Sequence, residues 1–344
     1  MSRVVTAAEG SGGEDTARFL EEVLLPLVPP ELRSALGGGG LDRLDDGAWI
    51  RVGDTYIVLT MDSHTVKPLE FPGGSLGKLA ACGTINDLVV MGARPVAVMD
   101  ALLVEEGTPY DDVKRVLRDF TEILRSFSIS LIGGDTKVMP RGSLDKIVIS
   151  TVGIGVAKRV IDDSPRPGDK IIVTGPVAEH GATILAAQLG MLDSAKGLRS
   201  DVKPLLPSLM PVIERFGEAI HAARDATRGG LAAVLNEWCK KCGLEAVIER
   251  SAVPVRDEVR SFLEVLGIDP MQVACEGVAV LSVDPSAADE VVKELRALGE
   301  SSATIIGEVV EPESPALRGR VVVVTEIGGR VLLEARGLNL PRIC

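Results

Sequence analysis

Hydrophobic residues in the first half of the chain form short runs that predict β-strands. The strands are expected at residues 56–60, 96–104, 129–132 and 147–156. Two helical stretches lie among them, and the clearer one is expected to have Thr108 as its N-cap, Pro109 at its first position and Asp111 in a capping-box-like pattern. Its apolar face carries Val113, Val116, Leu117, Phe120, Ile123 and Leu124. This pattern predicts an N-terminal domain over residues 41–160.

The pattern changes at residues 162–169, where two prolines and a glycine stand among charged residues. We therefore place a domain boundary between residues 160 and 161. Further strands are predicted at residues 170–174, 245–249, 278–283 and 303–306, and helices at 182–189, 231–242 and 287–298. The second half thus has an α+β pattern, and its domain is expected to span residues 161–312.

Both ends of the chain are expected to be less regular. Residues 1–40 are predicted to form a mobile, glycine-rich arm with one apolar-periodic helix around residues 19–27. Near the other end, two β-type runs flank the tandem glycines of residues 326–329 and predict a hairpin. Residues 335–344 show no clear periodicity. We therefore expect residues 313–344 to form a hairpin and a mobile tail that ends in Cys344.

Composition and charge narrow the classes of function. A chain of 344 residues is large enough for two compact domains with a site between them. A net charge of −12 opposes nucleic-acid binding, but it allows a nucleotide whose phosphates are bridged to carboxylates by a divalent cation. No stretch approaches ~18 apolar residues and no secretory signal is evident, so we expect a cytoplasmic protein without a membrane partner.

Aspartates at predicted strand ends and turns are the first candidates for chemistry. They are Asp45, Asp46, Asp62, Asp87 and Asp135. Mg²⁺ is typically bound by a few carboxylates together with substrate phosphates. Aspartate is also common at caps and turns, so each residue taken alone has an ordinary structural explanation. Taken together, they favour a metal–nucleotide site.

Two glycine-rich loops could approach phosphate groups. In residues 71–78, FPGGSLGK, Gly73, Gly74 and Gly77 precede Lys78 at the expected start of a helix. This is not a Walker A sequence, and an ordinary turn is the competing interpretation. The second loop, residues 225–231, DATRGGL, adds an arginine and two glycines at a helix start, which again suits an anion.

The cysteines need separate explanations, because five is an odd number and argues against a disulfide framework. Cys344 could be a chance terminal residue, but ten extended residues from Ala335 onward span up to about 33 Å and could carry its thiol into a cleft. Cys239 and Cys242 form a lone CxxC, and two incidental thiols at a helix end are preferred to a zinc or redox site.

Seven segments, read in order, resemble one protein family. They are MDSHTVKP (61–68), FPGGSLGKLAACGTINDL (71–88), GGDTK (133–137), AEHGATIL (178–185), DATRGGL (225–231), ACEG (274–277) and the terminal LPRIC. The sequence resembles the HypE family of hydrogenase maturation proteins, in the superfamily of aminoimidazole ribonucleotide synthetase and selenophosphate synthetase. The resemblance implies a two-domain α+β fold of the PurM-like type, in which each domain is a mixed sheet backed by helices. It also implies a homodimer formed through the N-terminal domains, with ATP in a cleft that they form.

The resemblance further implies a reaction and its partners. HypF attaches a carbamoyl group to the sulfur of the C-terminal cysteine, ATP phosphorylates the carboxamide oxygen, and loss of phosphate leaves a thiocyanate. A complex of HypC and HypD then accepts the cyanide for a nickel–iron hydrogenase. Phosphorylation turns the amide oxygen into a good leaving group, and Mg²⁺ with a lysine neutralises charge during the transfer. The predicted enzyme is an ATP-dependent carbamoyl dehydratase.

The resemblance assigns roles to individual residues. Cys344 is the carrier, and Glu276 and Lys137 are candidates for removing the amide protons. Glu276 is preferred because a carboxylate can accept a proton at neutral pH without a large pKa shift. The metal region is matched by Asp45, Asp62, Asp87 and Asp135, and the nucleotide region by Lys78, Gly73, Gly74, Asp62, Asp87, Asp135, Thr136, Thr227 and Arg228.

Two other interpretations stay open. The first is a relative that phosphorylates a free small molecule, such as a purine intermediate, thiamine monophosphate or selenide, although that chemistry needs no tail thiol. Selenide chemistry would also call for a reactive residue near the N-terminus, where no cysteine precedes Cys82. The second is a nucleotide-binding scaffold for maturation partners. One departure from the family is Glu9–Gly10, where relatives often carry His-Gly, so an N-terminal histidine has no counterpart here.

Overall fold

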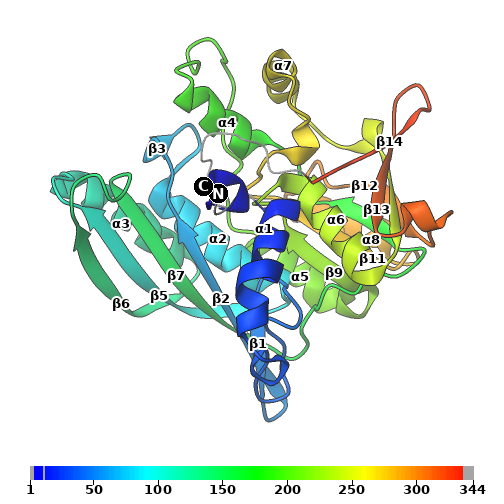
Figure 1. The fold of residues 1–344 in the computed structure, drawn as a ribbon, viewed down its shortest axis with the longest axis horizontal. Helices are drawn as coiled ribbons and strands as arrows, with labels where there is room; N and C mark the ends of the chain where they lie inside the picture. Colours follow the sequence, from blue (N-terminus) through cyan, green and yellow to red (C-terminus); the bar gives the residue numbers. More distant parts are fainter. Residues whose placement is uncertain (1–3, 11, 336–344) are drawn as a thin grey trace.

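Two large β-sheets with their helices make up most of the molecule (Figure 1). The computed structural model describes residues 4–10 and 12–335. One sheet is built from strands between residues 48 and 157, and the other from strands between residues 170 and 332. Each sheet mixes parallel and antiparallel pairs and is backed by helices, so the predicted two-domain α+β fold is confirmed.

The N-terminal sheet has five strands in the order β1-β2-β7-β5-β6. These are β1 (Ala48–Val52), β2 (Thr55–His64), β7 (Ile147–Ala157), β5 (Arg94–Glu105) and β6 (Ser130–Met139). Buried and less buried residues alternate along β7, because only one face of the sheet is covered. Helices α2 (Leu76–Val90) and α3 (Tyr110–Ser126) cover that face, and the short strands β3 (Glu70–Phe71) and β4 (Gly74–Ser75) precede α2.

The C-terminal sheet has seven strands in the order β14-β13-β10-β12-β8-β11-β9. These are β8 (Lys170–Val173), β9 (Ile220–Asp225), β10 (Glu245–Glu249), β11 (Ala279–Val283), β12 (Thr304–Val310), β13 (Arg320–Val324) and β14 (Arg330–Leu332). The helices are α4 (Glu179–Gln188), α5 (Leu206–Phe216), α6 (Gly230–Cys242), α7 (Asp257–Leu266) and α8 (Ala288–Ala297). Side chains of β8 alternate, so that Ile172 packs with the α5 and α8 side and Ile171 with the α6 side.

Helix α2 joins the two domains. It packs on the N-terminal sheet and α3 on one side, and on α5 and β9 of the C-terminal domain on the other. Because it is buried almost all round, its sequence lacks the one-sided apolar pattern of a surface helix. Gly77 allows the close approach of α2 to α3, since a Cβ there would lie 1.9 Å from the Val116 carbonyl oxygen. Polar residues of α2 therefore reach the junction between the domains.

Several predicted elements are confirmed and others are corrected. The strand at residues 245–249 and the hairpin of β13 and β14 form as expected, and the hairpin joins the sheet because β13 pairs in parallel with β10. The prediction of Thr108 as an N-cap was wrong: α3 has Pro109 at that position, without a side-chain cap. Helix α5 was missed because Pro211 lies within it, and β9 because three of its six buried residues are His221, Arg224 and Asp225.

The N-terminal arm lies beside α6. Helix α1 (Gly13–Phe19) continues through a π-helical segment, Leu20–Leu24, so the helix starts earlier than predicted. The backbone N–H of Glu14 donates to the Ala335 carbonyl over 3.1 Å, which places the arm next to the end of the described chain. Within the described ranges, no helix is both long enough and apolar enough to span a bilayer.

Candidate active site

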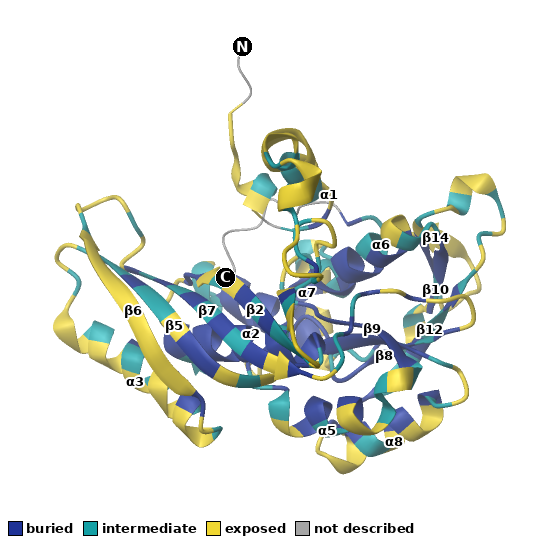
Figure 2. Ribbon diagram, turned by 90° about the horizontal axis from the view of Figure 1, so that it is seen from below, coloured by how far each residue is buried: buried dark blue, intermediate teal, exposed yellow. Residues whose placement is uncertain are grey.

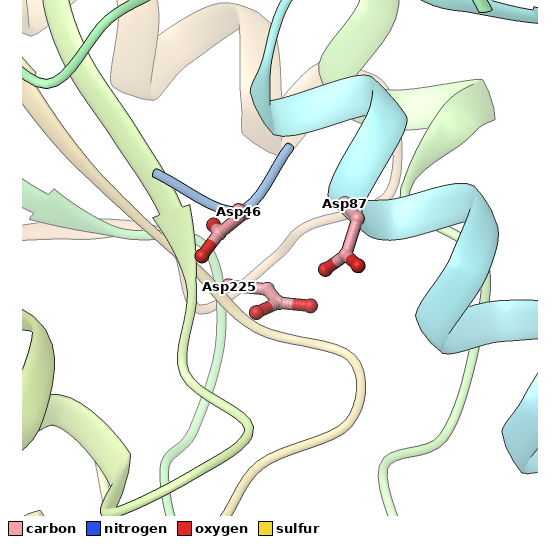
Figure 3. Close-up of side chains that lie close together, drawn as sticks. All are labelled: Asp46, Asp87 and Asp225. Carbon is pink, nitrogen blue, oxygen red and sulfur yellow. The ribbon is translucent and has the colours of Figure 1, made fainter. Parts of the chain in front are cut away.

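Three aspartates from distant parts of the chain meet at the junction between the domains (Figure 3). One carboxylate oxygen from each of Asp46, Asp87 and Asp225 lies within 4.8 Å of the others. Figure 3 shows the three side chains close together, with the carboxylates of Asp87 and Asp225 facing one another. Residues 4–10 and 12–335 hold no other such group of three histidine, cysteine or acidic side chains.

Each aspartate reaches the cluster from a different element. Asp87 lies in the last turns of α2, and Asp225 is the final residue of β9. Asp46 lies in the loop before β1, where the Thr60 hydroxyl is 3.1 Å from the Asp46 carbonyl oxygen and also donates to the carboxylate of Asp87. The cluster thus depends on the packing of α2 against β9.

The electrostatics of the cluster favour a bound cation. Burial raises the pKa of Asp46 and of Asp87 well above the ordinary aspartate value, and neighbouring carboxylates raise it further. Burial and the charge of Asp62 raise the pKa of Asp225 to about 6. Oδ2 of Asp46 and Oδ2 of Asp225 are buried without a hydrogen-bond partner. A divalent cation would satisfy these oxygens and remove the repulsion between them.

A buried arginine holds the edge of the cluster. The Nε of Arg224 lies 2.7 Å from Oδ2 of Asp163 and 3.5 Å from Oδ1 of Asp46. Asp45, predicted as a metal ligand, instead lies 2.5 Å from the Nζ of Lys241 through its Oδ1. The structure therefore brings Asp46, rather than its neighbour Asp45, into the group with Asp87.

Asp62 lies near the cluster without joining the group of three. Its Oδ2 is 3.1 Å from Nε2 of the buried His64. Burial alone would raise its pKa, but the hydrogen bond and charge of His64, together with Arg228, hold the pKa well below the ordinary value. Asp62 is therefore ionised, and its charge raises the pKa of both Asp87 and Asp225.

Glu276 is buried beside these carboxylates, with 3% of its surface exposed. Burial raises its pKa well above the ordinary glutamate value, and the charges of Asp225, Asp201 and Asp62 raise it further, whereas Arg228 lowers it. The expectation that Glu276 needs no large pKa shift was wrong, because it lies in a desolvated and acidic environment. Positive charge brought close to Glu276 would lower its pKa and favour the ionised carboxylate.

The glycine-rich loop at residues 71–78 packs against the protein itself. A Cβ on Gly73 would lie 2.5 Å from the Ser200 carbonyl oxygen, and one on Gly74 would lie 2.5 Å from Val202. The Nζ of Lys78 donates to the Gly73 carbonyl over 3.1 Å. These glycines therefore allow the loop to contact the C-terminal domain closely, which is a structural reason for their presence.

The second glycine-rich loop borders the aspartate cluster directly. The Thr227 hydroxyl donates to Oδ1 of Asp225 over 3.3 Å. The charge of Arg228 lowers the pKa of Asp62, Asp225 and Glu276. Gly12 of the arm backs this loop, since a Cβ there would lie 2.8 Å from the Cβ of Arg228.

Three predicted residues lie away from the cluster in the single chain. Asp135, Thr136 and Lys137 belong to β6, the outer strand of the N-terminal sheet, which is exposed along nearly all its length (Figure 2). The metal group does not include Asp135. Cys344, the predicted carrier, lies outside the described residues.

The CxxC pair does not form a recognisable metal site among the described residues. Burial raises the pKa of the Cys239 thiol to about 12, and burial also raises that of Cys242. Both thiols are therefore protonated at neutral pH, which disfavours metal binding and redox chemistry.

Sequence reasoning missed Asp225 and Arg224 as site residues. It named Asp46 among the aspartates that favour a metal–nucleotide site, but the resemblance assigned the ligand role to Asp45. Asp46 stood beside a chosen residue, and Asp225 was the first residue of the loop DATRGGL. That loop was interpreted as anion-binding from its arginine and glycines alone. The sequence feature that could have identified Asp225 was the aspartate at the start of this loop, ahead of its arginine and glycines.

Comparisons with known proteins agree with this fold. Residues 44–157 match the N-terminal domain of AIR synthase related proteins, and residues 166–320 match the C-terminal domain. A relative from Rhodobacter capsulatus, carbamoyl dehydratase HypE, is 38% identical over 345 residues, which cover 99% of this chain and 98% of the relative.

Two solved structures are also similar over nearly the whole chain. A crystal structure of HypE in complex with ATP is 35% identical, with a TM-score of 0.81, and covers 99% of this chain and 100% of that one. A HypE chain from a crystal structure of a HypE–HypF complex is 32% identical, with a TM-score of 0.80, and covers 95% of this chain and 99% of that one. Identity at this level over both domains places the chain in the HypE family of hydrogenase maturation proteins, within the AIR synthase related proteins.

Proposed function

We propose that this chain is an ATP-dependent carbamoyl dehydratase that converts a thiocarboxamide on Cys344 into a thiocyanate. The thiocyanate would supply the cyanide ligand of a nickel–iron hydrogenase. The observation that carries the proposal is the cluster of Asp46, Asp87 and Asp225 at the domain junction, in which Oδ2 of Asp46 and Oδ2 of Asp225 are buried without a hydrogen-bond partner. Glu276 is close enough to this cluster for the charge of Asp225 to raise its pKa. The names of the relatives, carbamoyl dehydratase and HypE in complex with ATP, support the same reaction.

The nucleotide and a divalent cation fit this junction. Asp46, Asp87 and Asp225 would hold Mg²⁺, which would bridge the phosphates of ATP to the protein and neutralise charge in the transfer. Lys78, Thr227 and Arg228 stay candidates for nucleotide contacts. Asp62 remains a further candidate, because it is ionised and close enough to influence Asp87 and Asp225.

The proposed reaction balances in two steps. The carboxamide oxygen attacks the γ-phosphorus of ATP, the bond to ADP breaks, and one amide proton leaves, which gives a phosphorylated imidate. The second N–H proton then leaves while the C–O bond breaks, releasing inorganic phosphate and the thiocyanate. The net change is thiocarboxamide plus ATP to thiocyanate, ADP, phosphate and one proton.

Glu276 is our first candidate for accepting a proton, with Lys137 as the alternative. Burial and neighbouring carboxylates raise the pKa of Glu276, and positive charge brought close to it would favour the ionised form that accepts a proton. Arg228 already lowers the pKa of Glu276, in the required direction.

The end of the described chain lies close enough for the proposed carrier to reach this site. Ala335 is fixed to Glu14 of the arm, and Gly12 of the same arm packs on Arg228 beside the cluster. Nine residues follow Ala335, and nine extended residues span up to about 30 Å. This length supports the proposal that the sulfur of Cys344 can enter the site and also meet a partner outside it.

A homodimer is part of the proposal. The outer face of the N-terminal sheet and both faces of β6 are open, and they expose Met61 at 73%, Ile132 at 58% and Val138 at 67%. Apolar surface of this kind is typical of a protein interface. Lys137 and Asp135 lie on β6, so a second copy bound there would bring them to the interface.

HypF is the proposed carbamoyl donor, and a complex of HypC and HypD is the proposed acceptor of the cyanide.

Intact-mass spectrometry would test the reaction. The protein is incubated with HypF, carbamoyl phosphate and ATP, and compared with Cys344→Ala and Asp87→Asn. We expect the native chain to gain one carbamoyl group that becomes one cyano group, Cys344→Ala to gain neither, and Asp87→Asn to stop at the carbamoyl stage. If HypF modifies a control acceptor but this chain gains no Cys344-dependent adduct, the proposal is wrong and phosphorylation of a free small molecule becomes the better explanation.

A further inference from the structure

A buried asparagine ties the loop of Glu276 to the helix that carries Asp87. Asn86 lies on α2 and has 1% of its surface exposed. Its Nδ2 donates to the carbonyl oxygens of Lys203, over 3.1 Å, and of Glu276, over 3.3 Å. Its Oδ1 accepts the backbone N–H of Leu205 over 2.7 Å. One side chain of the N-terminal domain therefore holds two separate segments of the C-terminal domain.

The peptide groups on both sides of Glu276 are held. Asp201 accepts the backbone N–H of Glu276 over 3.1 Å and that of Gly277 over 3.0 Å, while Asn86 binds the Glu276 carbonyl. Gly277 is needed for this arrangement, because a Cβ there would lie 2.1 Å from the Asp201 carbonyl oxygen. The backbone of Glu276 is thus fixed relative to α2 and cannot shift without breaking buried hydrogen bonds.

We propose that Asn86 is a positioning residue that aligns Glu276 with the Asp87 carboxylate across the domain junction. Asn86 and Asp87 are adjacent on α2, so the base and the cation site share one rigid support. This inference rests on the proposed function of Glu276. A misplacement of about 1 Å at a catalytic group can cost about 100-fold in rate, which is the scale of the expected effect.

Only a side-chain amide can make this set of bonds. The site requires two N–H donors for carbonyl oxygens and one acceptor for a backbone N–H, which is the inventory of asparagine. Aspartate has the same shape and would keep the bond from Leu205, but it would place an oxygen against two carbonyl oxygens. Asn86→Asp therefore removes the two donor bonds with little change in volume.

The first test compares Asn86→Asp and Asn86→Ala with Thr84→Val in the full-length protein. Thr84 lies on the same helix and is fully buried. Its hydroxyl shares a 2.6 Å hydrogen bond with that of Thr151, which belongs to the N-terminal sheet and not to the loop of Glu276. We expect both Asn86 variants to form thiocyanate about 100-fold more slowly from the carbamoylated chain, with the KM for ATP changed less than about 3-fold. Thr84→Val should stay near the native rate.

A double-mutant cycle with Glu276→Gln tests whether Asn86 acts through Glu276. If it does, adding Asn86→Asp to Glu276→Gln should cost far less than the single Asn86→Asp change, because the aligned group is already gone. The same loss in both backgrounds would show a general structural role and overturn the proposal.

Hydrogen exchange tests the alignment without any turnover. We expect the backbone amides of residues 274–277 to exchange faster in Asn86→Asp than in Thr84→Val at matched thermal stability. Equal exchange in the two variants would refute the inference, even if the proposed reaction holds. If the native chain forms no thiocyanate but the exchange differs as expected, the alignment holds and the assigned reaction is wrong.

Discussion

Carboxylates at the domain junction are buried close to one another, which is unfavourable for their ionised forms. This arrangement is the main indication of function. Asp46, Asp87 and Asp225 lie close enough to repel one another, and Oδ2 of Asp46 and Oδ2 of Asp225 are buried without a hydrogen-bond partner. Structures keep such repulsion where a ligand relieves it. The grouping of the three carboxylates thus points to a bound cation. Asp45 instead pairs with Lys241 through its Oδ1, and its Oδ2 is buried without a hydrogen-bond partner.

Asp225 should make the stability of the cation-free protein depend on pH. Its pKa is raised from 3.8 to about 6, so the folded state binds a proton more tightly than the unfolded state does. The protonated Asp225 stabilises the folded state fully below pH 3.8, and this stabilisation is lost as the pH rises through about 6. The loss lowers the free energy of unfolding by at most about 3 kcal/mol. Asp225→Asn should therefore gain stability relative to the native protein between pH 4 and 6.

Urea unfolding in EDTA across this pH range measures that difference, and Asp284→Asn is the control. The pKa of Asp284 is lowered by hydrogen bonds from Ser286, so its substitution should not give a gain that grows with pH. A stability difference for Asp225→Asn that is independent of pH would contradict the prediction. Added Mg²⁺ should stabilise the native protein but not Asp225→Asn.

Helix α2 positions the site at the scale of secondary structure. It carries Asn86 and Asp87 at one end, and its position is set by close packing against α3 through Gly77. Sequence patterns predicted the strands and the exposed, amphipathic α3 with its apolar face, because one-sided burial leaves a periodic trace. The same patterns did not define the bounds of α2 and did not predict β9. Both elements are buried on nearly all sides, so their sequences show no alternation between apolar and polar positions.

Gly77→Ala should destabilise the protein by about 1–3 kcal/mol, because its Cβ would lie 1.9 Å from the Val116 carbonyl oxygen and force the two helices apart. Gly10→Ala is the matched control, since a Cβ there has no heavy atom within 4 Å, and its effect should stay within about 0.5 kcal/mol. Chemical unfolding of both variants provides the comparison. Equal stability of the two would show that α2 and α3 separate at little cost.

At the scale of the whole molecule, one sheet is left half covered. Helices pack on both faces of the C-terminal sheet, whereas the N-terminal sheet keeps one open face and the exposed strand β6 (Figure 2). Asp135 and Lys137, which the resemblance assigned to the site, lie on this strand. A second copy of the chain is the partner that would place them in an interface.

Ile132→Lys should weaken the proposed dimer, because it places a charge on apolar surface that pairing would bury. We expect sedimentation velocity to show a dimer for the native protein and at least about a 10-fold higher dissociation constant for the variant. Ile327→Lys is the control, since Ile327 is 95% exposed in the turn between β13 and β14, away from the N-terminal sheet. A monomeric native protein, or equal effects of both variants, would argue against this interface.

The two-domain α+β plan, the family and the motifs around Asp87, Glu276 and DATRGGL could be predicted from the amino-acid sequence, because strand runs, a one-sided helix and short collinear motifs are local properties of the chain. Which carboxylates meet could not be predicted in this way, because it depends on how distant segments pack. Three features depend on the packing of α2 between the two domains. They are the presence of Asp46 rather than Asp45 in the cluster, the position of Asp225 beside Asp87, and the hydrogen bonds of Asn86. Burial and the charges of neighbouring carboxylates then raise the pKa of Glu276, and both causes depend on distances between residues far apart in sequence.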